Sequence, residues 1–190
     1  IGTLNTGTIT LNGNNTYTGG TFLNGGLTVV AGSANAFGSG TITTSNSTVT
    51  KLATSGNYTL TNAITLGSGN NGSYTLQLGG SNDYTLSGVI SGPSDGELAK
   101  FDTNTVTLSG ANTFSGNLDI FDGVLRLLND SAAGMNEVNL SGGTLQLASA
   151  NPTLYGIFAD SGTTLTFQAG STVNLSVPGD GSRLGGTLTA

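Results

Sequence analysis

The chain has 190 residues, of which only 7% are charged and 32 are glycine, and its formal net charge at pH 7 is −6. Phosphate recognition needs clustered lysine and arginine, and the four basic residues are far apart in the sequence, which argues against nucleic-acid binding. Cysteine and histidine are absent, which excludes disulfides, thiolate metal sites, a Ser-His-Asp triad and most zinc sites. No run of eighteen apolar residues is present to form a membrane-spanning helix.

Short strands are predicted along the whole chain. Apolar residues alternate with threonine and serine, and no window has the apolar stripe of an amphipathic helix, so an all-β fold without substantial helix is expected. Clusters of Gly, Asn, Ser and Asp, such as 67–72 and 178–181, separate the strands, as is typical of turns. The clearest strand predictions, in chain order, are 8–11, 27–30, 41–43, 48–52, 74–78, 105–108, 124–128, 144–147, 163–167 and 172–177.

Residues 1–30 and 98–127 are two copies of one sequence, which align without a gap. Apolar residues fall on apolar residues and glycines on glycines, and such a repeat indicates stacked equivalent units rather than one wrapped core. Tyr17 and Phe114 share one position, which predicts a packing role for both rings. The matched residues are Leu11, Gly13, Asn15, Thr16, Tyr17 and Gly19 in the first copy and Leu108, Gly110, Asn112, Thr113, Phe114 and Gly116 in the second.

Two architectures fit many short strands: a sandwich or barrel, and a parallel β-solenoid. The internal repeat and the shortness of the strands favour the solenoid, with about seven to nine coils. Seven coils at about 4.8 Å each give a rod of about 35 Å. The side chains predicted to point inward are those of Ile9, Leu11, Leu23, Leu27, Val29, Leu60, Ile64, Leu66, Leu76, Leu78, Leu86, Leu98, Val106, Leu108, Ile120, Leu125, Leu127, Leu145, Leu147, Leu165, Phe167, Val173 and Leu175.

The second copy and the residues before it also resemble a known family. Residues 86–92 read Leu-Ser-Gly-Val-Ile-Ser-Gly, Leu98-Ala99-Lys100 follows, and 105–116 read Thr-Val-Thr-Leu-Ser-Gly-Ala-Asn-Thr-Phe-Ser-Gly. This text resembles the autotransporter-associated β-strand repeat, or passenger-associated transport repeat, and residues 7–26 repeat its later part. One departure is 117–119, Asn-Leu-Asp, where the family usually has Gly-Thr, and this departure is expected to weaken the second turn.

The resemblance implies a right-handed parallel β-helix that belongs to the passenger of a type V secreted protein. Residues 1–190 are then expected to be a single segment of a longer passenger, exported across the outer membrane of a Gram-negative bacterium and either displayed on its surface or released. The implied partner is the passenger's own translocator barrel, and no cofactor is expected. A chain without cysteine cannot lock itself with disulfides before export, and a solenoid can fold coil by coil as it emerges.

Adhesion or self-association is the biological use that we expect, with surface glycans or proteins of host or bacterial cells as partners. A passive stalk that presents another domain is the alternative, and a carbohydrate-active β-helix enzyme is a more distant one. Protruding loops on a rigid rod are common binding sites, and the longest departures from the repeat style are 91–97 and 128–137. The candidate binding residues in these loops are Asp95, Glu97, Asp130 and Glu137.

Other site chemistry has weaker signals, and each has a plain structural alternative. The carboxylate pairs Asp119/Asp122 and Asp95/Glu97 have the composition of an acid–base pair, but loop acids are usually solvated charges. The loops 94–97 and 179–181 resemble calcium turns without the tandem motif of calcium-binding solenoids. Tyrosine rings are candidates for sugar stacking, at Tyr58, Tyr74, Tyr84 and Tyr155.

Threonine pairs separated by one residue form a hydroxyl lattice in ice-binding solenoids if they stack in one row. Their spacing along this chain is irregular, so one face is not expected to carry them all, and threonine is also ordinary strand composition. The pairs are Thr8/Thr10, Thr41/Thr43, Thr48/Thr50, Thr59/Thr61, Thr105/Thr107, Thr164/Thr166 and Thr187/Thr189.

Overall fold

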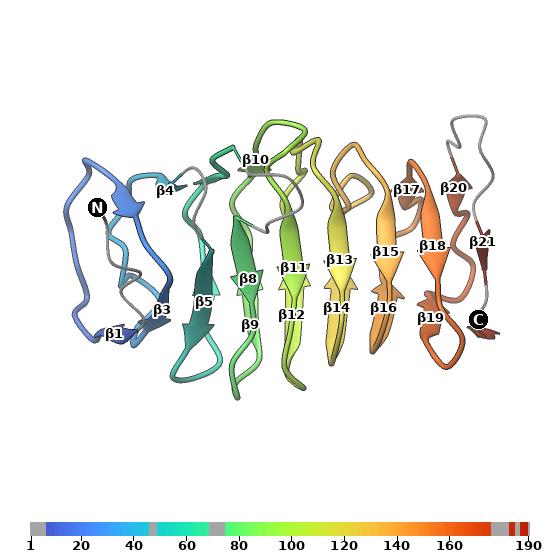
Figure 1. Ribbon diagram of the computed structural model, residues 1–190, viewed down its shortest axis with the longest axis horizontal. Helices are drawn as coiled ribbons and strands as arrows, with labels where there is room; N and C mark the ends of the chain where they lie inside the picture. Colours follow the sequence, from blue (N-terminus) through green and yellow to red (C-terminus); the bar gives the residue numbers. More distant parts are fainter. Residues whose placement is uncertain (1–6, 46–48, 69–74, 176–182, 185–186, 190) are drawn as a thin grey trace.

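The chain forms a parallel β-solenoid of about eight turns, in which successive coils stack along one axis (Figure 1). The computed structural model describes residues 7–45, 49–68, 75–175, 183–184 and 187–189. Every strand pairing between described residues is parallel, which excludes the antiparallel sandwich. The parallel solenoid is therefore confirmed, and its right-handed sense stays a prediction.

A nine-stranded sheet runs the length of the rod and holds one strand from each coil. Residues 19 to 26 positions apart pair along it: Val138 pairs with Ile157, and Thr50 pairs with Leu76. Its strands, in order, are β1 (Gly7–Leu11), β3 (Leu27–Ala31), β5 (Thr50–Thr54), β8 (Leu76–Leu78), β11 (Leu98–Lys100), β13 (Leu118–Ile120), β15 (Val138–Leu140), β18 (Ile157–Ala159) and β21 (Arg183–Leu184).

Two further sheets and a short strand pair form the other sides of the coils. The seven-stranded sheet contains β6 (Thr59–Leu60), β9 (Tyr84–Leu86), β12 (Thr105–Leu108), β14 (Val124–Leu127), β16 (Thr144–Leu147), β19 (Thr164–Phe167) and β22 (Thr187–Thr189). The four-stranded sheet contains β2 (Thr21–Leu23), β4 (Ile42–Thr44), β7 (Ile64–Thr65) and β10 (Ile90–Ser91). The pair is β17 (Thr153–Leu154) with β20 (Asn174–Leu175).

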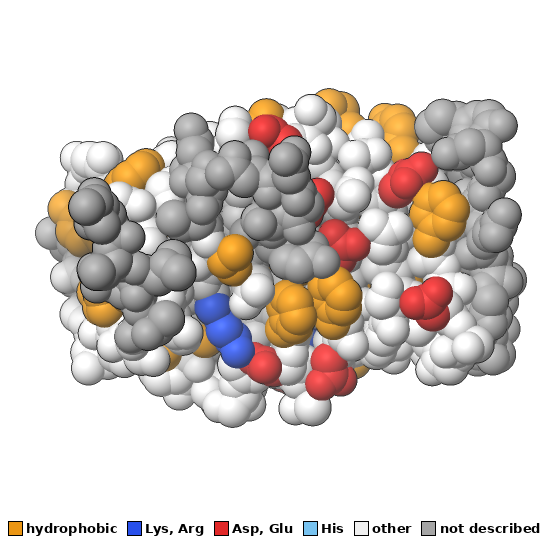
Figure 2. Space-filling model, in the orientation of Figure 1, with side chains coloured by type: hydrophobic (Ala, Val, Ile, Leu, Met, Phe, Trp, Pro, Cys, Tyr) orange, Lys and Arg blue, Asp and Glu red, His pale blue; other side chains and the backbone are white. Residues whose placement is uncertain are grey.

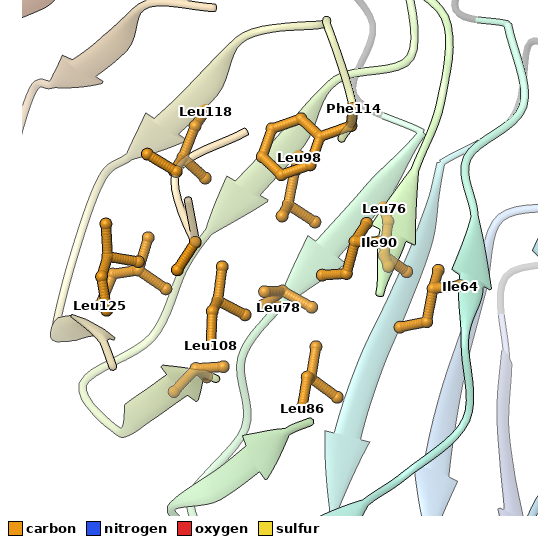
Figure 3. Close-up of a cluster of buried hydrophobic side chains, with 14 of the residues drawn as sticks. Ile64, Leu76, Leu78, Leu86, Ile90, Leu98, Leu108, Phe114, Leu118 and Leu125 are labelled. Atoms are coloured by element: carbon orange, nitrogen blue, oxygen red, sulfur yellow. The ribbon is translucent and has the colours of Figure 1, made fainter. Parts of the chain in front are cut away.

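The core is a set of aliphatic columns, because side chains alternate along each strand and in-register pairing stacks the inward ones. Val106 pairs with Leu125 and Leu108 with Leu127, and all four are buried. Figure 3 shows Leu78, Leu86, Leu108 and other side chains from successive coils gathered in the interior. Burying one aliphatic side chain stabilises the fold by about 1.5–3 kcal/mol before conformational entropy is subtracted, so the columns are the main stabilising element.

Most predicted inward positions are buried, and the exceptions lie near the ends of the rod. Leu11, Leu27, Phe167 and Val173 are only partly buried, although they pack against the core. The Leu175 side chain lies outside the described part. The inward prediction was wrong for Ile9, which is 46% exposed because β1 is the edge strand of its sheet and pairs only with β3 among the described strands.

No helix occurs in the described ranges, and so none there is long and apolar enough to cross a membrane. The expected weakening at 117–119 is not seen. Leu118–Ile120 forms β13, which pairs with strands on both sides, and Leu118 is fully buried.

Candidate functional site

Asn112, the asparagine of the Asn-Thr-Phe motif in the second repeat copy, joins three successive coils by hydrogen bonds. Its Oδ1 accepts a hydrogen bond of 2.8 Å from the backbone N–H of Ile90 in the preceding coil, and Nδ2 of Asn112 donates one of 2.8 Å to the carbonyl of Ala132 in the following coil. Asn112 is only 2% exposed. The segment around Asn112 is not a strand, so the side chain supplies hydrogen bonds that a sheet ladder supplies elsewhere.

The first copy repeats half of this arrangement. Nδ2 of Asn15 donates a 2.8 Å hydrogen bond to the carbonyl of Ala36, in the coil that follows. Thr16 and Thr113, which come next in the two copies, are both exposed. The asparagine of the repeat motif therefore connects coils in both copies, buried in the second and half-buried in the first, and the threonine lies on the surface.

The motif glycines differ in how tightly they are packed. A Cβ atom on Gly110 would collide with the carbonyl oxygen of Gly88, and one on Gly116 would collide with that of Gly96. A Cβ on Gly19 would meet nothing within 4 Å. Close backbone approach therefore requires glycine in the second copy but not at this position of the first.

The aromatic residue of the second copy, Phe114, packs closely against a glycine of the next coil. Phe114 is fully buried, and a Cβ on Gly134 would lie 2.8 Å from its ring. The predicted packing role of Phe114 is confirmed. The Tyr17 ring also packs against a glycine of the next coil, since a Cβ on Gly38 would lie 2.9 Å from it, but Tyr17 is 41% exposed and its hydroxyl shares a 2.8 Å hydrogen bond with the Thr21 hydroxyl.

Lys100, the lysine of the Leu-Ala-Lys motif, is fully buried inside the rod. It pairs with Leu78 on one side and Ile120 on the other, so it occupies a column of aliphatic side chains. Its Nζ, with three N–H donors, lies within hydrogen-bond distance of four oxygens at the corner of the coil. These are the carbonyls of Phe101 (2.7 Å), Asp102 (2.6 Å) and Asp122 (3.2 Å) and Oδ1 of Asn104 (3.1 Å).

Burial lowers the pKa of Lys100 to about 8, and the charges of Asp102, Asp122 and Asp83 oppose this shift in part. Sequence reasoning missed this residue, although a signal was present. Leu98 was predicted to point inward, and the period of two in a strand places Lys100 on the same side. A lysine at an inward position needs oxygen acceptors, which the turn after the strand provides.

Asp102 connects the same corner to the preceding coils. Its carboxylate pairs with the Lys51 ammonium, and its Oδ2 accepts a 2.7 Å hydrogen bond from the N–H of Gly80. Burial raises the pKa of Asp102, but the hydrogen bonds from Lys51 and Gly80 and the charges of Lys51 and Lys100 outweigh it and hold the pKa below its usual value. Asp102 has a positive φ of 61°, a strained conformation that these contacts stabilise.

The two predicted binding loops lie along one side of the rod. The Leu98 N–H donates to the carbonyl of Asn117 and the Leu118 N–H to that of Glu137, so Glu97, Asn117 and Glu137 have equivalent places in three successive coils. Glu97 and Glu137 are half-buried. Burial and the nearby charges of Asp119 and Asp95 raise the pKa of Glu97.

The other two loop acids are exposed at the surface. Oδ1 of Asp130 accepts a 2.9 Å hydrogen bond from the N–H of Asn151, whereas Asp95 projects from the turn that contains Pro93. The geometry thus brings Glu97 and Glu137 into one row and leaves Asp95 and Asp130 apart from it. Binding by these four residues stays a prediction.

The two carboxylates of the predicted pair Asp119/Asp122 have different environments. Asp119 is 8% exposed and accepts a 2.8 Å hydrogen bond from Nδ2 of Asn139, while Asp122 is exposed and caps the N–H of Gly123. Burial raises the pKa of Asp119, and the bond from Asn139 opposes this. On the face in Figure 2 the acidic side chains are spread apart. Among the described residues no three acids gather to hold a metal ion, and the 179–181 turn lies outside them.

The tyrosine and threonine predictions have mixed outcomes. Tyr84 was a candidate for sugar stacking, and this was wrong, since it is 3% exposed and its hydroxyl donates a 2.9 Å hydrogen bond to the carbonyl of Leu52. Tyr58 and Tyr155 are half-buried, and Tyr74 lies outside the described residues. The threonine pairs do not share one face, as expected, because Thr8/Thr10 lie in the nine-stranded sheet and Thr105/Thr107 in the seven-stranded sheet.

Comparison with known proteins agrees with the stacked motif. The passenger-associated-transport-repeat family matches residues 4–31 and 98–127. The chain carries two passenger-associated transport repeats. Both copies of the motif match this repeat family, and the resemblance drawn from the motif residues is confirmed.

The chain is also similar to a curated protein over most of its length. The Adhesin BmaC autotransporter of Brucella suis biovar 1 (strain 1330) is 32% identical to it over 193 residues, which cover 90% of this chain. The chain spans only 6% of the length of that relative. No solved structure shows a significant match to the chain.

Proposed function

We propose that this passenger repeat region is a rod displayed on the surface of a Gram-negative bacterium, and that folding of its coils supports export of the passenger. The observation that carries the proposal is the Asn112 connection, in which one buried side chain bonds to the coil before and the coil after. In a solenoid, stability is a sum of terms within coils and between neighbouring coils. A residue that strengthens two contacts between coils therefore promotes folding from one coil to the next.

The transport step follows from this stepwise folding. The passenger leaves its translocator barrel as an extended chain, and each coil that folds outside the cell stacks on the previous one. A folded coil is too wide to return through the barrel, so folding opposes backsliding. The absence of cysteine is compatible with this route, since no disulfide can close a loop before translocation.

The test compares two neighbouring motif residues in the full passenger, expressed with its translocator in cells. Asn112→Ala removes both bonds between coils, whereas Thr113→Ala changes an exposed side chain. Surface exposure is measured over time by antibody labelling and by protease accessibility. We expect Asn112→Ala to slow exposure severalfold, with Thr113→Ala at the wild-type rate. The proposal is wrong if the two variants are exported equally fast.

A second pair of substitutions tests the core of the same coil. Val106→Asp and Leu108→Asp each place a charge in a fully buried column, which must prevent that coil from stacking. Both are expected to reduce surface exposure and to leave the amount of precursor unchanged. Export at the normal rate would show that the folding of this coil does not contribute to transport.

Adhesion is the second part of the proposal, and two observations support it. The similar protein from Brucella suis is named an adhesin, and the 91–97 and 128–137 loops lie on one side of the rod. The purified chain, fluorescently labelled, is tested on glycans, matrix proteins and bacterial or epithelial cells. Saturable binding that is lost in an Asp95→Asn, Glu97→Gln variant supports adhesion through the loop. A flat signal from folded, monodisperse protein supports a passive stalk.

We propose no catalytic role for the region. A glycoside hydrolase needs two carboxyl groups that face the same substrate at a separation of about 5–9.5 Å. Here Asp119 is held by Asn139, and Asp122 caps its own turn. The arrangement supports binding or structural use of these acids.

A further inference from the structure

A polar hollow of about 220 Å³ lies on the outer face of the seven-stranded sheet, and neither the 91–97 loop nor the 128–137 loop lines it. Its floor is a row of outward side chains from successive coils. Thr59 pairs with Thr85, Thr85 with Thr107, and Thr107 with Arg126. Parallel strands are about 4.8 Å apart, so the row presents polar groups at that spacing along the rod. Asp83 and Tyr58 also line the hollow.

Arg126 differs in exposure and in charge pairing from the other basic side chains that the structure describes. Lys51 is paired with Asp102, and Lys100 is buried, whereas Arg126 is exposed and has no carboxylate of a described residue within ion-pair distance. The chain has a net charge of −6, so a free guanidinium in a polar hollow is an isolated binding point for an anion. Arginine binds carboxylates through two parallel hydrogen bonds, which favours a planar carboxylate.

The rest of the hollow is suited to a ligand with many hydroxyl groups. The hydroxyls of Thr59, Thr85 and Thr107 have no hydrogen-bond partner among the described residues, so each can act as donor and acceptor. Thr59 is exposed, Thr85 is half-buried, and Thr107, at the floor of the hollow, is 9% exposed. Asp83 accepts a 2.7 Å bond from the N–H of Thr105 and retains a second carboxylate oxygen as an acceptor. The half-buried Tyr58 adds an aromatic ring at the end of the row.

A peptide ligand fits this surface less well. β9 and β12 each have a strand on both sides, and the edge strand beside the hollow, β6, is only two residues long, which offers little backbone for an added strand. The lining consists of Asn, Thr, Asp, Arg and Tyr side chains, without an apolar pocket for a peptide side chain. We propose that the hollow around Arg126 binds a carboxylate-bearing saccharide, with its carboxylate on Arg126 and its hydroxyl groups on the threonine row and Asp83.

This inference deepens the proposed adhesion and rests on surface display of the rod, but its geometry is independent of the 91–97 and 128–137 loops. Binding of the purified 190-residue chain is measured by isothermal titration calorimetry with four probes. Oligogalacturonate is the carboxylated saccharide, dextran sulfate the sulfated one, dextran the neutral one and poly-glutamate the acidic peptide. We expect saturable binding of oligogalacturonate, weaker binding of dextran sulfate, and no binding of the other two.

Matched variants locate the site. Arg126→Gln is expected to weaken oligogalacturonate binding at least tenfold, because it removes the only exposed unpaired cation of the described surface. Arg126→Lys keeps the charge but loses the paired hydrogen bonds, so it should retain only part of the affinity. Thr107→Val removes one hydroxyl at nearly constant volume and should weaken binding severalfold. Lys51→Gln removes the same charge from another sheet and should leave binding unchanged.

The proposal is overturned if oligogalacturonate does not bind, or if Arg126→Gln binds it as tightly as the wild type. Equal weakening by Lys51→Gln would also overturn it, because that result shows general charge attraction. Tighter binding of poly-glutamate than of oligogalacturonate would replace the saccharide with an acidic peptide. Circular dichroism checks the fold of each variant. Export of Arg126→Gln is followed in cells, so a failure of display is separated from a failure of binding.

Discussion

Tyr17 and Phe114 occupy the same position of the repeat, yet Tyr17 is 41% exposed and Phe114 is fully buried. The difference follows from the places of the two coils. Phe114 has described coils on both sides, whereas Tyr17 belongs to the first described coil and has one on a single side. In a solenoid, burial is a property of the stack as well as of the coil. The same sequence position therefore differs in stability contribution between the two copies.

Replacement of Asn112 by Ala should be costly. The change leaves the N–H of Ile90 and the carbonyl of Ala132 without these hydrogen bonds in the interior, which we expect to lower the free energy of unfolding by about 2–4 kcal/mol. Urea unfolding at pH 7 measures it. Thr113→Ala is the control and should stay within about 0.5 kcal/mol of the wild type. Equal effects of the two substitutions would show that the connection between coils is not stabilising.

Gly134 and Gly162 both have a positive φ, but of the two only Gly134 is crowded by a neighbouring side chain. Alanine substitutions at the two positions therefore distinguish the cost of backbone strain from the cost of crowding. Gly134 (φ 78°) lies against Phe114, so Gly134→Ala combines the left-handed strain of about 1–2 kcal/mol with overpacking of about 1–3 kcal/mol. Gly162 (φ 86°) has open space around it, and Gly162→Ala should cost only the strain. Thermal and urea unfolding of both variants test the difference. Similar losses would mean that the Phe114 ring moves aside without cost.

Lys100→Met should destabilise the rod even though methionine suits an apolar column. The substitution leaves the carbonyl oxygens of Phe101, Asp102 and Asp122 without the ammonium donor, and we expect a loss of about 2–3 kcal/mol. Lys51→Met removes a partly exposed ion pair and should cost about 0–1 kcal/mol. Urea unfolding at pH 7 compares them. A variant Lys100→Met as stable as Lys51→Met would contradict the structural role of the buried ammonium.

The stability of the wild type should rise with pH above about 8. The pKa of Lys100 is about 8 in the folded chain and 10.5 when unperturbed, so between these values the unfolded chain binds more protons. The free energy of unfolding therefore increases, by about 1–3 kcal/mol. Above pH 10 burial of Tyr84 acts in the opposite direction, since its raised pKa keeps the proton in the folded chain while the unfolded tyrosine ionises.

Urea midpoints at pH 7.5 and 9.5 measure the Lys100 contribution, with Lys100→Met as the reference that lacks it. We expect the wild type to gain stability across this interval relative to the variant. A parallel response of the two proteins would show that Lys100 does not titrate in the folded state at these pH values.

Much of the fold could be predicted from the alternation of residues and the internal repeat. Alternation identified buried residues such as Leu108 and Leu125, and the repeat distinguished a solenoid from a sandwich. The burial of Lys100 could not be predicted from its residue type, because lysine is rarely fully buried and most of its acceptors here are backbone carbonyls, which leave no mark in the sequence. Tyr84 was missed for a related reason, since its partner is the carbonyl of Leu52, 32 residues earlier.

The candidate sites were less predictable. The row formed by Glu97 and Glu137, and the alignment of Thr107 with Arg126, depend on the lengths of the coils between them. A change of one residue in any corner would shift these neighbours, whereas the aliphatic pattern within strands would look the same. The local sequence therefore predicts on which face of a strand a residue lies. Which residues lie next to it in the neighbouring coils depends on the register between coils.

The coils of this rod differ in length although their strands remain in register. Leu98 pairs with Leu118 after 20 residues, whereas Thr50 pairs with Leu76 after 26. The additional residues fall between strands, so the columns of the core are not interrupted. Changes of length at the corners are thus expected to cost little folding free energy, and the outer surface of such a rod can vary while the columns of its core stay the same.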